Sequence, residues 1–230
     1  MVLFDIVFRY QFSYLHFQGD FMDKKSYTIE FKNISLVFDN KEILKNFNLN
    51  IKRGEKILIS SPSGSGKTSL LRLLMGFNLA SSGEIFVEGI KLQEDTVDKI
   101  REKIGYLSQK MSFRNLKISQ LIEEILSYKR NSKIEFNMEK IQELLAFLKL
   151  ENKVLNQEIN DLSGGEKQRI GFLISLLLDR DIWIFDEITS SLDKELKEKI
   201  VEYINSTEKT IIMISHDKIE ALDKFKKVVL

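Results

Sequence analysis

The sequence has no cysteine, a single proline and almost no net charge in its 230 residues. The absence of cysteine excludes a disulfide scaffold and a thiolate metal site, and it fits a reducing cytosol. The 35 lysine and arginine residues nearly balance the 34 aspartate and glutamate residues, which leaves a formal charge of +1. Because no overall field attracts nucleic acid, we expect no nucleic-acid partner.

A long hydrophobic run is also missing. The longest run, 170–178, is interrupted by Gly171 and Ser175, and it is far shorter than the roughly 20 residues that span a bilayer. We therefore expect a soluble chain, or one that associates with a membrane only through a partner. With 43% hydrophobic residues, the chain has enough apolar material for one ordinary domain or two small, closely packed ones.

Residues 1–21 differ from the rest because they are dense in phenylalanine and tyrosine. No basic opening precedes them, and Asp5 and Arg9 break the apolar pattern, so the segment does not read as a signal peptide. Two interpretations stay open. In the first, the segment is an artefact, with translation beginning at Met22, or an unstructured extension. In the second, the aromatic segment contacts a membrane or a partner. The folded unit is then 22–230.

The hydrophobic pattern predicts strands at both ends of the chain and helices between them. Alternation over 27–38, with a shift at Asn33, predicts a strand with a turn or bulge, followed by a turn at 39–40 and a second strand. Short apolar runs at 55–61, 182–185 and 210–215 are typical of parallel strands buried on both faces. A turn is expected at 81–83, and an amphipathic helix at 138–150. We expect an α/β fold with a helical insertion over about 95–175.

The segment 60–68, SSPSGSGKT, is one residue away from the phosphate-loop pattern G-x-x-x-x-G-K-S/T. Ser61 stands where the first glycine is expected, and the only proline, Pro62, stiffens the loop. A predicted strand precedes the segment and a predicted helix follows it, which is the context that a phosphate loop requires. A chance match in a linker would lack this context, so the segment predicts nucleotide binding.

A phosphate loop holds its ligand with successive backbone N–H groups at a helix N-terminus. Gly64 and Gly66 can adopt positive φ and let the backbone approach the phosphates. Lys67 can bridge the β- and γ-phosphates, and the Thr68 hydroxyl can bind Mg²⁺. The loop residues expected to bind ATP are Ser63, Gly64, Ser65, Gly66, Lys67, Thr68 and Ser69.

Two acidic residues end the apolar strand predicted at 182–185. Asp186 is placed to hold Mg²⁺ through water, and Glu187 to polarise an attacking water. Two solvated acids at a strand end would be the ordinary interpretation if they stood alone. Together with a phosphate loop they predict a metal-assisted site.

The segment 162–169, LSGGEKQR, opens a further predicted helix that runs to Leu178. Ser163 is placed as the N-cap of that helix. Gly164 and Gly165 stand beside the helix start, where N–H groups can bind an anion. The alternative is an ordinary glycine-containing helix entry.

With these motifs in order, the sequence from about Tyr27 to Leu230 resembles the ATP-binding subunits of ABC transporters. Residues 162–166 match the LSGGE signature, and 190–193 match the D-loop. Gln109 matches the Q-loop glutamine, and His216 matches the switch histidine. The resemblance implies a P-loop NTPase core with a mixed sheet, an antiparallel β subdomain and a helical (signature) subdomain.

The resemblance also implies roles for individual residues. Glu187 would be the general base, His216 would orient water and sense the γ-phosphate, and Gln109 would serve catalysis and the metal together with Thr68 and Asp186. Phe38 would stack on adenine, although the strand alternation equally allows a core position. The further residues implied to bind ATP are Ser163, Gly164, Gly165, Glu166 and Asp193.

Three positions depart from the family pattern: Ser61 replaces glycine, Glu166 replaces the commoner glutamine, and Asp181 stands where a proline often precedes the strand. The resemblance implies a homodimer or heterodimer across ATP and a separate transmembrane permease, with the chain on the inner face of the cell membrane. We expect export, of iron or another small solute. The alternatives are a soluble non-transport ABC ATPase, as in cluster assembly, or a nucleotide-sensing cassette with weak turnover.

Overall fold

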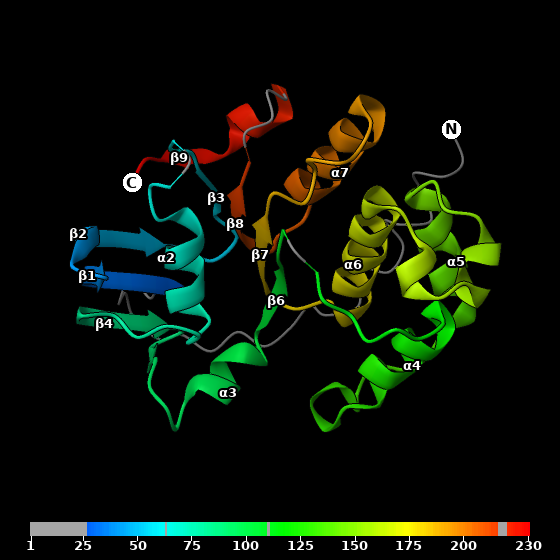
Figure 1. Cartoon of the computed structure of the whole chain (residues 1–230), viewed down its shortest axis with the longest axis horizontal. Helices are drawn as coiled ribbons and strands as arrows, with labels where there is room; N and C mark the ends of the chain where they lie inside the picture. The colour runs from blue at the N-terminus through cyan, green and yellow to red at the C-terminus, as the bar shows by residue number, and fades with distance from the viewer. Residues whose placement is uncertain (1–26, 63, 110, 216–219) are drawn as a thin grey trace, which may run out of the picture.

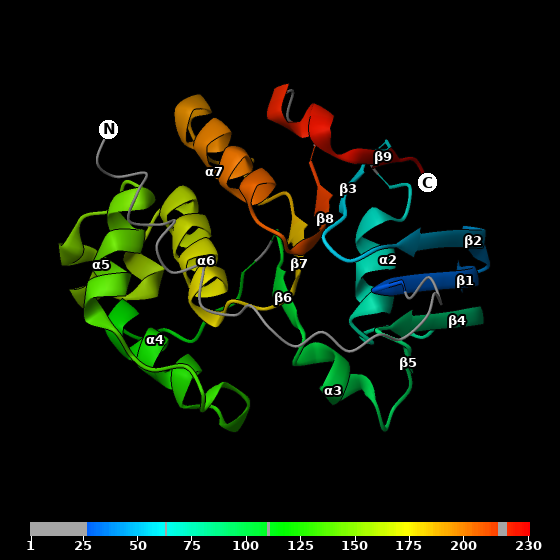
Figure 2. The same ribbon diagram turned by 180° about the vertical axis from the view of Figure 1, so that it is seen from behind.

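The computed structural model describes residues 27–62, 64–109, 111–215 and 220–230, and the segment 1–21 lies outside them. One of its two sheets has four antiparallel strands in the order β2-β1-β4-β5 (Figure 1 labels the first three, and Figure 2 also β5). The strands are β1 (Ile29–Phe38), β2 (Lys41–Ile51), β4 (Ser82–Val87) and β5 (Ile90–Lys91). This sheet is the antiparallel subdomain that the resemblance implied.

A bulge and a tight turn shape the β1–β2 hairpin. The register shifts next to Asn33, whose φ is 51°, which confirms the predicted bulge. Asp39 and Asn40 both have positive φ, as a hairpin turn of the right twist requires. Of the turn predicted at 81–83, Ser81 is a bend, whereas Ser82 and Gly83 already belong to β4. Only glycine permits this close approach of β4 to β1, because a Cβ at residue 83 would lie 2.4 Å from the Asn33 carbonyl oxygen.

The second sheet has five strands in the order β6-β7-β8-β3-β9, and all four pairings are parallel. Its strands are β3 (Lys56–Ile59), β6 (Ile104–Leu107), β7 (Ile182–Asp186), β8 (Thr210–Ile214) and β9 (Lys226–Val228). A mixed core sheet was expected beside the antiparallel subdomain, but every pairing between the described strands of the core sheet is parallel. Strand β6 lies inside the range expected to be helical, so the helical layer begins only after it.

The central strands of the parallel sheet are buried on both faces: successive side chains point to opposite sides, and every residue of β7 and β8 is buried. Ile182 and Ile184 of β7 join a core with the antiparallel sheet and α2 (Lys67–Leu74). Trp183 and Phe185 of the same strand join a second core with the helices on the other face. These helices are α4 (Ile118–Ser127), α5 (Met138–Phe147), α6 (Gly164–Leu178) and α7 (Lys194–Ser206) (Figure 2).

Short elements connect these layers. A small helix, α3 (Val97–Arg101), precedes β6, and the 3-10 turns are η1 (Lys129–Asn131), η2 (Asn152–Asn156), η3 (Ile159–Asp161) and η4 (Glu220–Lys224). Helix α5 ends three residues before the predicted limit of 150, and Lys149, just beyond it, has a φ of 54°. Within the described ranges, no helix is both long and apolar enough to cross a membrane.

Candidate functional site

The predicted phosphate loop connects β3 to α2, as a strand–loop–helix unit should. Gly64 and Gly66 have φ values of 80° and 94°, in the left-handed region that favours glycine. A Cβ on Gly66 would also lie 2.8 Å from the Ile43 side chain. The β1–β2 hairpin therefore packs directly against the loop, and only glycine fits at this contact.

The loop presents donors and one unpartnered hydroxyl. The first N–H groups of α2 point out of its N-terminus, and Lys67 donates to the carbonyl oxygens of Ser61 and Pro62 at 2.6 and 2.9 Å. Ser65 Oγ is buried and has no hydrogen-bond partner among the described residues. A buried hydroxyl normally has a partner, and a phosphate oxygen in the loop would supply one. Ser63 lies outside the described residues.

Thr68 and Asp186 meet at the start of α2. Thr68 Oγ1 donates to Asp186 Oδ2 at 3.2 Å, so the hydroxyl and the carboxylate expected to serve the metal come together from sequence positions 118 apart. Burial raises the pKa of the Asp186 carboxyl, the charge of Glu187 raises it further, and the hydrogen bond from Thr68 and the charge of Lys67 oppose this. A buried carboxylate with a raised pKa is suited to a cation.

These donors fit Mg²⁺, which typically takes one or two protein oxygens and completes its shell with water and substrate phosphates. Thr68 and Asp186 supply one hydroxyl and one carboxylate beside the phosphate loop. No three His, Cys, Asp or Glu side chains converge on a metal site anywhere in 27–62, 64–109, 111–215 or 220–230. Thr68 and Asp186 would hold the metal, and the phosphates of a bound nucleotide and water would complete its shell.

Glu187 follows directly on β7 and contacts Gln109 of the loop after β6. Gln109 Nε2 donates to Glu187 Oε2 at 3.0 Å. The backbone of Glu187 has a φ of 54°, and its N–H donates to the carbonyl of Ile214 on β8 at 3.0 Å. A non-glycine residue in this region is strained, and such strain gathers at functional sites. The proposed base is thus fixed at its backbone and its carboxylate.

The signature segment begins α6 with a capping box. Ser163 Oγ accepts from the Glu166 N–H at 3.3 Å, and Glu166 Oε2 accepts from the Ser163 N–H at 2.9 Å. The Ser163 hydroxyl also donates to Glu166 Oε2 at 2.6 Å. Ser163 and Gly164 are both exposed, so this helix N-terminus is open to a ligand from outside the chain.

Gln168 of α6 connects the signature helix to the D-loop. Its side chain donates to Ser190 Oγ at 3.1 Å and accepts from the Ser191 N–H at 3.2 Å. Gly165 lies against the same loop, because a Cβ there would be 2.8 Å from the Ser191 carbonyl oxygen. Sequence analysis missed Gln168. The available signal was a glutamine on the buried face of a predicted helix, beside Gly171 and Phe172.

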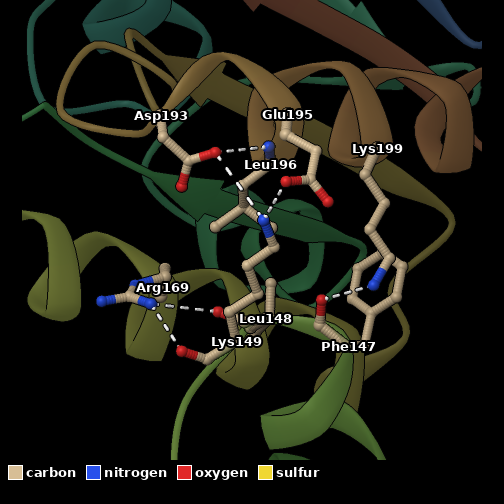
Figure 3. Close-up of polar contacts among 8 residues, drawn as sticks. All are labelled: Phe147, Leu148, Lys149, Arg169, Asp193, Glu195, Leu196 and Lys199. Carbon is tan, nitrogen blue, oxygen red and sulfur yellow. Dashed lines mark hydrogen bonds and ion pairs between the residues drawn. The ribbon is translucent and has the colours of Figure 1, made fainter.

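A second connection runs from the end of α5 to α6 and α7 (Figure 3). Arg169 Nη1 donates to the carbonyls of Leu148 and Lys149 at 3.2 and 2.8 Å. The Lys149 ammonium lies 2.7 Å from Glu195 and 3.9 Å from Asp193. Asp193 is the N-cap of α7, accepting from the Leu196 N–H at 3.0 Å, and this bond and the charge of Lys149 lower its pKa.

The remaining predicted residues are Phe38 and His216. Phe38 ends β1 and is 65% exposed, so the core position left open by the strand pattern is wrong. It lies on the hairpin whose Ile43 contacts the phosphate loop, and an exposed ring there is available for stacking. His216 lies outside the described residues.

A parallel sheet with a phosphate loop at one strand and an acidic pair at another defines a P-loop nucleotide-hydrolysing fold. The family model described as ABC transporter matches residues 44–190. The chain belongs to this family and is an ABC ATPase, the ATP-binding subunit of a transporter. The resemblance drawn from the motifs is confirmed.

Individual relatives agree with this assignment. The energy-coupling factor transporter ATP-binding protein EcfA1 of Mycoplasma mobile is 34% identical over 202 residues, which are 84% of this chain and 73% of that protein. The spermidine/putrescine import protein PotA of Thermotoga maritima is 32% identical over 88% of this chain and 55% of PotA. The cassette MJ0796 of Methanocaldococcus jannaschii, a post-hydrolysis dimer with ADP and Pi, matches with a TM-score of 0.75 and 29% identity over 88% of this chain and 94% of that one.

Proposed function

We propose that this chain powers transport through a separate membrane subunit, by closing as a dimer on ATP and opening after hydrolysis. The observation that carries the proposal is the pair of contacts beside the phosphate loop, Thr68 with Asp186 and Gln109 with Glu187. They bring a metal-binding pair and a base together at the same strand end. The solved dimer of MJ0796 with ADP and Pi supports the same cycle.

The charges explain how one ATP would join two subunits. Lys67 and the N-terminus of α2 would meet the phosphates from one subunit. The exposed N-terminus of α6, with Ser163 and Gly164, would meet the γ-phosphate from the other. Loss of the γ-phosphate removes the anion shared by the two helix ends, so hydrolysis weakens the dimer. Phe38 would hold the adenine, and Asp193 and Glu166 would position the D-loop and the signature helix.

In the hydrolytic step, Glu187 would accept a proton from the attacking water while Gln109 holds its carboxylate. Bound Mg²⁺ would neutralise charge that develops on the phosphate oxygens. His216 is proposed to orient the water and to sense the γ-phosphate. Loss of a general base typically slows a reaction about 10²–10⁴-fold.

The direction and the cargo of transport can be tested directly. The sequence favoured export of iron or another small solute, whereas PotA, a relative above 30% identity, is named for import of spermidine and putrescine. The relatives' names therefore support import more than export. Cargo uptake and release by vesicles carrying the co-purified membrane subunit would decide the direction. Purification without any multi-span partner would favour the non-transport alternative.

The test of the ATPase cycle compares the parent with Glu187→Gln and with Glu143→Gln, an exposed change on α5. We expect Glu187→Gln to lose at least about 10²-fold in phosphate release while it still binds ATP and forms an ATP-dependent dimer on size exclusion. Glu143→Gln should match the parent. Full turnover in Glu187→Gln would remove Glu187 from its role, and ATP binding without turnover in the parent would favour the nucleotide-sensing cassette.

A further inference from the structure

Ser61, which replaces the first glycine of the phosphate-loop pattern, has a buried hydroxyl with three contacts. Ser61 Oγ donates to the carbonyl of Ser60 at 2.6 Å and accepts from the N–H of Leu230 at 2.8 Å. A longer contact, 3.5 Å, joins it to the carbonyl of Leu230. Ser61 is not among the described residues with positive φ, so serine causes no strain here.

These contacts continue the pairing of β3 with β9 into the phosphate loop. The two strands are parallel and in register up to Ile59 and Val228, and the Ser60 N–H donates to the Val228 carbonyl at 3.0 Å. In a regular parallel ladder, the next bond would run from the Leu230 N–H to the Ser60 carbonyl. The Ser61 hydroxyl lies between those two groups and bonds to both.

The same residue also contacts Lys67, the lysine of the loop that is expected to bind the phosphates. The Ser61 carbonyl accepts from Lys67 Nζ at 2.6 Å. The burial pattern of residues 228–230 supports the contact between Ser61 and Leu230. Val228 and Leu230 pack against the core, whereas Val229 between them is 73% exposed. Strand alternation therefore continues beyond Val228, the last residue of β9, a strand that Figure 1 shows next to β3.

We propose that Ser61 is a positioning residue for the nucleotide site: its hydroxyl fastens the start of the phosphate loop to residue 230 and so holds the Ser61 carbonyl at Lys67. This inference rests on the proposed function of that loop. The serine then takes the place of the usual glycine and positions the loop through its hydrogen bonds between the ends of β3 and β9. A glycine at 61 would leave the Leu230 N–H and the Ser60 carbonyl without this bridge.

Variants at both ends of the contact test the proposal. Ser61→Ala and Ser61→Gly remove the hydroxyl, and Leu230→Pro removes the N–H donor. Ser60→Ala, at an exposed neighbouring hydroxyl, and Leu230→Ala, which retains the donor, are the matched controls. The readouts are the dissociation constant for ATP, measured by equilibrium titration, and kcat at saturating ATP.

We expect Ser61→Ala, Ser61→Gly and Leu230→Pro each to raise the dissociation constant about tenfold, with kcat within about twofold of the parent. The double variant of Ser61→Ala with Leu230→Pro should have a dissociation constant for ATP within about twofold of either single variant, because both substitutions remove the same contact. Both controls should bind as the parent does. Parent-like binding by Ser61→Gly, or additive losses in the double variant, would overturn the proposal.

The outcome is separable from that of the proposed function. If the parent binds ATP but does not turn it over, the ATPase cycle fails while the binding measurements still decide the role of Ser61. If the parent binds no ATP, the same double-variant cycle is read by thermal unfolding. Additive losses there would overturn the contact itself, and a binding-incompetent parent would overturn its role at the nucleotide site.

Discussion

Gln109 Nε2 donates to Glu187 Oε2 at 3.0 Å, joining residues 78 positions apart. The contact exists because β6 and β7 are neighbours in the parallel sheet and both end at the same edge. Chain segments that follow parallel strands meet at the carboxyl end of the sheet, where α/β folds place their ligands. An amide group that donates a hydrogen bond to a carboxylate orients it but does not protonate it.

The first prediction concerns this pair. Gln109→Ala removes the donor that orients Glu187, so kcat for ATP hydrolysis should fall about 10²-fold, as misplacement of a catalytic group by about 1 Å typically does. The dissociation constant for ATP should change little, because Gln109 contacts the base rather than the loop. Steady-state phosphate release checks this, with Gln142→Ala on the exposed side of α5 as the control. An unchanged kcat would contradict it.

Asp186 offers a prediction in which stability and activity change in opposite directions. Because burial and the charge of Glu187 raise its pKa, ionisation of Asp186 costs stability, and this cost appears as the pH rises from the unfolded pKa through the folded one. Asp186→Asn should therefore raise the melting temperature at pH 7, by about 2–4 °C for ~1 kcal/mol in a domain of this size, and abolish Mg²⁺-dependent turnover.

Thermal unfolding of Asp186→Asn and the parent, followed from pH 4 to 8, measures the effect. The difference in melting temperature should grow with pH across the titration of Asp186. A variant less stable than the parent at pH 7 would mean that the hydrogen bond from Thr68 outweighs the burial of the charge.

Gly164 and Gly165 form a matched pair of adjacent glycines. A Cβ on Gly165 would lie 2.8 Å from the Ser191 carbonyl, whereas one on Gly164 would meet nothing within 4 Å. Gly165→Ala should therefore displace the D-loop and destabilise the fold by about 1–3 kcal/mol, the usual cost of overpacking. Gly164→Ala should leave the melting temperature unchanged or raise it, since alanine favours a helix over glycine. Equal melting temperatures for the two variants would refute this account.

The capping box of α6 gives a pH-dependent prediction. The hydrogen bonds from the Ser163 hydroxyl and N–H lower the pKa of Glu166. The stabilisation by this carboxylate is therefore complete above its unfolded pKa and is lost as the pH falls through the lower folded value. Glu166→Ala should cost roughly 0.5–1 kcal/mol at pH 7 by loss of the cap, and much less at pH 3.

Glu166→Gln is the natural comparison, because glutamine is commoner at this position in the resembled family and keeps an acceptor oxygen. It should retain most of the stability of the parent and remove most of the pH dependence between pH 3 and 7. Chemical denaturation at both pH values measures this. A pH dependence that persists in Glu166→Gln would assign it to another carboxylate.

The sequence by itself determined the motifs, their order and the elements that carry them. Glycines at positions of positive φ, an N-cap serine and continuous apolar strands are local signals, because the backbone geometry they permit or exclude depends on the residue itself. The phosphate loop, the N-cap Ser163 of α6 and the bulge at Asn33 followed from such signals. The family resemblance placed Gln109 and Asp193 through the same motifs.

Contacts between distant segments were decided only by the tertiary structure. Whether Phe38 lies in the core or on the surface depends on what the hairpin packs against, and in the structure its ring is exposed. The partners of Gln168, Ser190 and Ser191, could not be assigned from the sequence, since the bridge requires a close approach of α6 to the D-loop. Ser61 looked like a defect in its motif, and only the parallel pairing of β3 with β9 gave its hydroxyl a partner in Leu230.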